Sequence, residues 1–160
     1  MSAHQEVAVP VDSSLDYTTT NFREHPERYR VGRGEQGVFL GEPYKSELLP
    51  HWRFRTPALA ETSAAYIYAR FLAYKGAVDF VGMDIARKFL QMGYTRARRY
   101  ANHGSGRKYD QATGTLLPQE ADWQTNEKAA SARIFYAYYA KVNADPDYRR
   151  AKQQHQQTFD

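Results

Sequence analysis

The sequence predicts a mainly α-helical protein: a compact bundle of about three long helices and a short C-terminal helix, with a long ordered Gly/Pro-rich loop before them and little β-structure. Apolar residues recur at helical spacing in three long segments, and residues that favour helix ends stand at their limits. A chain of 160 residues is expected to form a single domain, here over residues 16–157. Residues 1–15 show no periodicity and are expected to be a disordered tail.

The part of the chain before the first long helix is predicted to be irregular. One helical turn is expected near Pro26, and a short strand is expected at residues 38–40 within an otherwise extended loop over residues 30–54. Long ordered loops are uncommon in compact domains, and those that exist are often functional. The side chains expected to hold this loop against the helices are those of Leu48, Leu49, Trp52 and Phe54.

The first long helix is expected to begin at Pro57 and to end before Gly76. Thr56 is a favourable N-cap, Pro fits the first helical position, and Gly fits the position after the last helical residue. Apolar residues at i, i+4 and i+7 predict a core stripe, made of Ile67, Phe71 and Tyr74.

The second long helix is expected to run from a cap at Asp79 towards Asn102. A helical wheel places one group of polar residues within an arc of about 120°, comprising Arg87, Lys88, Gln91, Thr95, Arg98, Arg99 and Asn102. Arg96 falls instead on a side with Ile85, Phe89 and Met92. As an alternative, Gly93 splits this segment into two helices and divides the basic arc.

A third long helix is expected over residues 125–143, after a loop that contains Gly104, Gly106 and Gly114. Asp145 then caps a last short helix from Pro146 to about Gln156.

Positive charge is concentrated in one segment of the chain. The net charge is +4, and residues 85–109 contain seven basic residues and no acidic one. Arg98 and Arg99 have no acidic residue three or four positions away, so local ion pairs are not available to them. This pattern favours an anionic partner, nucleic acid or another polyanion, bound by Arg87, Lys88, Arg98, Arg99, Arg107 and Lys108. The alternative is a solvated helix face whose arginines pair with acidic residues elsewhere in the fold.

A second possible anion site comprises Arg33, Arg96 and His103. Arg96 is expected either to pair with Glu35 or Glu47, or to bind phosphate in a cleft between the glycine-rich loop and the helix. The GxGxxG run over residues 32–37 lacks the strand before it and the helix after it that dinucleotide binding requires. We therefore interpret its glycines as turn positions, with an anion-binding nest as the alternative.

Several classes of site are not expected. The chain has no Cys, which excludes disulfides, thiolate metal sites and a Cys nucleophile. Its five His residues are not at ligand spacing, so no metal and no cofactor are expected. No apolar run reaches the roughly 20 residues of a membrane span, and no secretory signal is visible, so we expect no membrane partner and a cytoplasmic location.

Four runs of the sequence carry a resemblance to a known family. They are RYRVGRGEQGV (residues 28–38), PYKSELLPHWRFRTP (43–57), DFVGMDIARKFLQMGYTRARRYAN (79–102) and GRKYD (106–110). They resemble the bacterial and viral family catalogued as domain-of-unknown-function family 4385. The resemblance implies a small cytosolic protein without an assigned activity, and it carries over no catalytic residues.

Three functions are therefore considered from the sequence. The first is a nucleic-acid-binding module that contacts the phosphate backbone through the basic helix and the basic loop that follows it. The second is an enzyme acting on a phosphorylated or nucleic-acid substrate, with Arg33, Glu35, Arg96 and His103 around a cleft. The third is an interaction module for an acidic protein.

Overall fold

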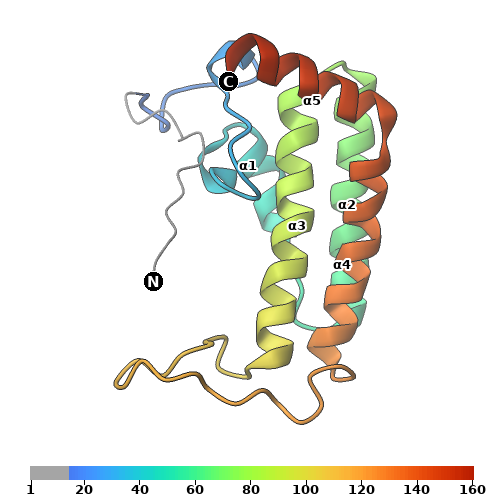
Figure 1. Cartoon of the computed structure of the whole chain (residues 1–160). Helices are drawn as coiled ribbons and strands as arrows, with labels where there is room; N and C mark the ends of the chain where they lie inside the picture. The colour runs from blue at the N-terminus through green and yellow to red at the C-terminus, as the bar shows by residue number, and fades with distance from the viewer. Residues whose placement is uncertain (1–14) are drawn as a thin grey trace.

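A computed structural model describes residues 15–160 of the chain. Three long helices, α2 (Pro57–Gly76), α3 (Phe80–Asn102) and α4 (Glu127–Ala144), lie side by side, and α5 (Pro146–Phe159) crosses one end of them (Figure 1). The described residues contain no strand, and their one isolated β-bridge joins Tyr109 to Leu116. The prediction of a mainly α-helical protein is confirmed, whereas the predicted tail lies almost entirely outside the described residues.

The helix starts follow the expected capping chemistry. Thr56 Oγ1 accepts a hydrogen bond from Leu59 N at 3.2 Å, and Asp79 Oδ1 accepts one from Gly82 N at 3.0 Å. Asp145 Oδ1 accepts bonds from the first turn of α5, so its predicted role as a cap is confirmed. Each cap satisfies backbone N–H groups that have no partner within the helix.

α3 is one continuous helix, so the predicted alternative of a break at Gly93 is wrong. Gly93 is instead the position of α3 on which the ring of Phe135, in α4, packs. A Cβ atom at this position would lie only 2.3 Å from Phe135 Cδ1, so the missing side chain makes room for the ring.

α5 extends to Phe159, beyond the expected end near Gln156. Its glutamine-rich turn is ordered because His155 packs inward, against Tyr29 and Phe80. The His155 ring Nε2 lies 2.7 Å from Tyr29 O, to which it donates a hydrogen bond. This contact fixes the end of the chain beside the N-terminal segments (Figure 1).

The segments before α2 are short helical turns joined by loop. They are η1 (Pro26–Arg28), η2 (Val38–Leu40), α1 (Tyr44–Leu48) and η3 (Leu49–His51). The predicted turn near Pro26 is confirmed, but the strand expected at residues 38–40 is wrong. Gly37 has φ +79° and turns the chain, so Leu40 N bonds back to Gly37 O rather than across to a neighbouring strand. Trp52 anchors the loop as expected, since its Nε1 donates to Phe89 O at 3.1 Å.

Candidate functional site

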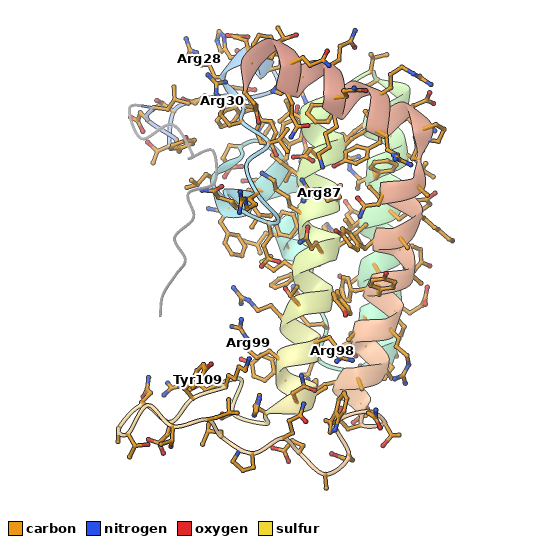
Figure 2. The ribbon with its side chains drawn as sticks, viewed as in Figure 1. Arg28, Arg30, Arg87, Arg98, Arg99 and Tyr109 are labelled. Carbon is orange, nitrogen blue, oxygen red and sulfur yellow. The ribbon has the colours of Figure 1, made fainter. Side chains whose placement is uncertain are left out.

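The two halves of α3 have different surroundings. Every residue from Val81 to Leu90 is buried, because α2, α4, α5 and the N-terminal segments enclose this half of the helix. The C-terminal half extends past α5 and past the short helices that precede α2. One of its faces is therefore open, next to the loop of residues 103–126. Figure 2 shows the consequence: Arg87 lies among packed elements, while Arg98 and Arg99 lie near the end of α3, next to the loop that carries Tyr109.

The predicted exposure of Arg87 and Lys88 is wrong. Their relative exposures are 4% and 0%. Arg87 Nη2 lies 2.7 Å from Asp84 Oδ1, and its Nε donates to the Tyr148 hydroxyl at 3.0 Å. Its Nη1 donates to the carbonyl oxygen of Gly34. The glycine-rich loop and α5 therefore cover the face that the helical wheel assigned to solvent, and they supply the partners that make burial of these cations possible.

Asp84 is the centre of this buried cluster. Its carboxylate also accepts hydrogen bonds from the hydroxyls of Tyr29 and Tyr148, the second at 2.6 Å. Burial acts to raise the pKa of Asp84, but the charges of Arg87 and Lys88 outweigh burial and hold the pKa at about 2. Asp84 is thus ionised at neutral pH.

The glycine-rich loop presents carbonyl oxygens to α3. Gly32, Gly34 and Gly37 all have positive φ, which confirms their interpretation as turn positions. The carbonyls of Gly34 and Gln36 accept hydrogen bonds from Arg87 and Lys88. These carbonyls face cations, which is the reverse of the anion nest considered as an alternative.

An open pocket of about 640 Å³ lies where the end of α3 meets the following loop. α3 contributes Arg98 and Arg99 to its lining, and the loop contributes His103, Lys108 and residues 116–119. No acidic residue is among the residues that line it, all of which lie in the described part of the chain. Four of the residues singled out in the sequence therefore meet at one concave surface.

The cations of this pocket have no acidic partner. Within residues 15–160, no carboxylate lies within 4.0 Å of Arg98, Arg99 or Lys108. The Arg98 guanidinium lies 5.5 Å from the ring centroid of Trp123, a contact that orients the group without neutralising it. The pocket thus concentrates uncompensated positive charge, as anion binding requires.

Short contacts hold the loop across the pocket. Leu117 N donates to Lys108 O at 2.8 Å, beside the bridge between Tyr109 and Leu116. His103 is buried, and its Nδ1 lies 3.2 Å from Pro118 O. These contacts place Lys108 opposite the arginines of α3. No pattern in the sequence indicates this pairing, because it depends on how the loop folds back on itself.

Arg96 is half-buried and makes no ion pair with any described residue. The predicted pairing of Arg96 with Glu35 or Glu47 is wrong. Glu35 accepts a hydrogen bond from Thr95 at 3.0 Å, and Glu47 is held by Arg23 and Arg70.

The other predicted anion-site residues are dispersed. Of Arg33, Arg96 and His103, only His103 lines the pocket. Arg107 is exposed next to Lys108 at the pocket edge.

Comparison with known proteins gives one assignment. A family model described as Domain of unknown function (DUF4385) matches residues 12–158. The chain belongs to this family. No curated protein and no solved structure gives a significant match. Membership in DUF4385 confirms the resemblance carried by the four sequence runs, and it covers both the buried cluster and the open pocket.

Residues 15–160 lack two other kinds of site. No group of three or more His, Asp or Glu side chains is arranged to hold a metal ion. None of the described helices combines the length and the hydrophobicity needed to cross a membrane.

Proposed function

We propose that this DUF4385 protein binds nucleic acid through the phosphate backbone, at the pocket between the end of α3 and the loop of residues 103–126. The observation that supports this most strongly is the lining of the pocket: Arg98, Arg99 and Lys108 share one concave surface, and no acidic residue is among the described residues that line it. Arginine donates two parallel hydrogen bonds to phosphate oxygens, and lysine adds a compact charge. Contacts of this kind position a nucleic acid without reading its sequence.

An exposed aromatic ring beside a cation of the pocket favours nucleic acid over a polyanion without bases. Tyr109 is 54% exposed, and its ring centroid lies 5.9 Å from Lys108 Nζ. An aromatic side chain next to a basic surface provides a face on which bases stack, in a way that tolerates any sequence. Tyr100, which is 38% exposed, lies instead beside Phe54, with 6.2 Å between the two ring centroids.

An enzyme acting on a phosphorylated substrate is the second candidate. It is favoured by the volume of the pocket, about 640 Å³, which falls in the usual range for small-molecule sites. His103 would supply acid–base chemistry, and Glu35 accepts a hydrogen bond from Thr95, which lines the pocket. Arg33 and Arg96 are not among the residues that line it. A denaturing gel of a labelled oligonucleotide after incubation tests this candidate, because only an enzyme changes the oligonucleotide.

The binding proposal is tested with a fluorescein-labelled DNA duplex and fluorescence anisotropy at low ionic strength. Arg98→Ala/Arg99→Ala should weaken binding about tenfold or more, because each charge-assisted contact contributes on the order of 1 kcal/mol. Arg149→Ala/Arg150→Ala is the matched control, since it removes two adjacent, exposed arginines of α5 and changes the net charge equally. An equal loss in both variants would show that total charge, and not the pocket, determines binding. Absence of binding by the unaltered protein at about 50 mM salt would refute the proposal.

A further inference from the structure

Lys88 is a buried ammonium group with incomplete hydrogen bonding. Its side chain is 1% exposed, and Nζ donates to Gln36 O at 2.6 Å. The nearest carboxylate oxygen, Asp84 Oδ2, is 3.8 Å away, which is too far for a hydrogen bond. The ring centroid of Tyr29 lies 4.8 Å from Nζ. An ammonium group carries three donors, and burial with donors unmet is costly.

Asp84 does not complete the coordination of Lys88, because its oxygens serve other groups. Oδ1 accepts two bonds from Arg87, at 2.7 and 3.2 Å, and a third from the Tyr148 hydroxyl at 2.6 Å. Oδ2 accepts a hydrogen bond from the Tyr29 hydroxyl. One buried carboxylate is therefore shared by two buried cations. Asp160 is a second carboxylate that acts on Lys88, but Arg87 and Lys152 act on it with the opposite sign, and Arg28 and Arg30 line the adjoining cavity, so positive charge remains in excess.

A small cavity adjoins this ammonium group. Its volume is about 20 Å³, room for one particle of about the size of a water molecule. Lys88, Tyr29 and Gly37 are among the residues that line it. Gly37 directly follows Gln36, whose carbonyl oxygen accepts the hydrogen bond from Lys88. Its charged lining residues, all within the described part of the chain, are cations: Lys88, Arg28 and Arg30. Figure 2 shows Arg28 and Arg30 at the end of the bundle opposite Arg98 and Arg99, so this cavity is separate from the open pocket.

We propose that the cavity beside Lys88 is a binding site for one halide-sized monovalent anion, such as chloride. The ammonium group would hold the anion from within, and Arg28 and Arg30 would attract it from the surface. A neutral water molecule fits the same volume but leaves the excess positive charge uncompensated. An anion compensates it, and a monatomic anion needs the least room in so small a space.

The charged groups around Lys88 determine how the site responds to pH. α3 contributes Asp84 and Arg87, α5 contributes Lys152, and Asp160 follows the end of α5; all four influence Lys88 electrostatically. Burial is the largest influence and lowers the pKa of Lys88 to about 8 in the anion-free protein. Anion affinity should therefore fall as the pH rises above 8, since the neutral amine attracts no anion. The site does not depend on the proposed nucleic-acid binding.

The test is thermal unfolding at pH 7 and constant ionic strength, with gluconate replaced stepwise by chloride or bromide. The unaltered protein should show a saturable rise in Tm, because a ligand that binds only the native state stabilises it. Lys88→Met should lose the halide-dependent rise, and Arg98→Ala/Arg99→Ala should keep it. Arg30→Ala is a second variant at a partly exposed position, and it should shift the midpoint of the chloride titration to higher concentration.

Two results would overturn the proposal. One is the same Tm in chloride and in gluconate for the unaltered protein, which would mean that the cavity holds only water. The other is a halide-dependent rise in Lys88→Met equal to that of the unaltered protein, which would place the halide elsewhere. A crystal grown in bromide provides the direct observation, because an anomalous peak beside Lys88 supports the site and its absence at saturating bromide contradicts it.

Discussion

Replacing Asp84 by Asn removes the carboxylate at the centre of the buried cluster and leaves the side-chain volume nearly unchanged. Asp84 is 0% exposed, and it is the ion-pair partner of Arg87 at 2.7 Å and of Lys88 at 3.8 Å. Breaking a buried ion pair by removing one partner costs about 3–5 kcal/mol, because the remaining charge stays buried without compensation. The free energy of unfolding of a domain is about 5–15 kcal/mol, so Asp84→Asn should remove a large fraction of it.

Urea denaturation followed by far-UV circular dichroism measures this loss, and differential scanning fluorimetry should show a fall in Tm of roughly 6–20 °C for a domain of this size. Asp147→Asn is the control, since Asp147 is exposed and its pair with Arg150 is at the surface. Exposed pairs contribute about 0–1 kcal/mol. If Asp84→Asn changes the free energy of unfolding no more than Asp147→Asn does, the buried cluster does not stabilise the fold and the reasoning is wrong.

The pH dependence gives an independent check on the same residue. The pKa of Asp84 is lowered in the folded protein to about 2, so its contribution is fully present above the unfolded pKa of about 4 and is lost as the pH falls towards 2. The difference in stability between the unaltered protein and Asp84→Asn should therefore be constant from pH 7 to about pH 5 and should shrink below about pH 4.

Three further predictions concern single positions. In halide-free buffer, the free energy of unfolding should rise between pH 8 and 9, by at most about 1.4 kcal/mol, because the lowered pKa of Lys88 means that the unfolded chain binds more protons. Lys88→Met should lack this rise, and nearer pH 10 the raised pKa values of the buried tyrosines act in the opposite direction. Gly93→Ala should destabilise the protein by about 1–3 kcal/mol or more through collision with Phe135, whereas Gly76→Ala, with nothing within 4 Å of the added Cβ, should be neutral or stabilising in the same urea titration. Gly34→Ala should lower the free energy of unfolding by about 1–2 kcal/mol through backbone strain, because φ is +58°. A steric clash does not contribute, since the nearest atom to the added Cβ is 3.5 Å away. A Tm equal to that of the unaltered protein would show that the turn tolerates a side chain.

Local chemistry made the helix boundaries predictable from the sequence. The caps Thr56, Asp79 and Asp145 act within three residues of themselves, so nothing distant is needed to recognise them. The end of α5 was not predictable in this way. Its last turn is held by His155, whose partner Tyr29 O lies more than a hundred residues earlier in the chain.

The candidate site was predictable only where nothing covers α3. A helical wheel shows which residues share a face, but it does not show whether another segment packs on that face. The glycine-rich loop covers Arg87 and Lys88, while Arg98 and Arg99 stay accessible to the pocket. One signal in the sequence does separate the two pairs. Asp84 stands three and four positions before the buried cations, and no acidic residue stands at that spacing from Arg98 or Arg99.

The salt dependence of DNA binding tests the proposed nucleic-acid interface most directly. Because Arg87 and Lys88 are buried, four cations remain at or beside the pocket: Arg98, Arg99, Arg107 and Lys108. Each phosphate contact contributes about −0.9 to the slope of log K against log salt on duplex DNA. Contacts by all four cations predict a slope of about −3.6, and the loss of two contacts in Arg98→Ala/Arg99→Ala should reduce its magnitude by about 1.8. The slope of Arg149→Ala/Arg150→Ala should equal that of the unaltered protein. A slope near zero, or one that Arg98→Ala/Arg99→Ala leaves unchanged, would contradict binding of the phosphate backbone at this pocket.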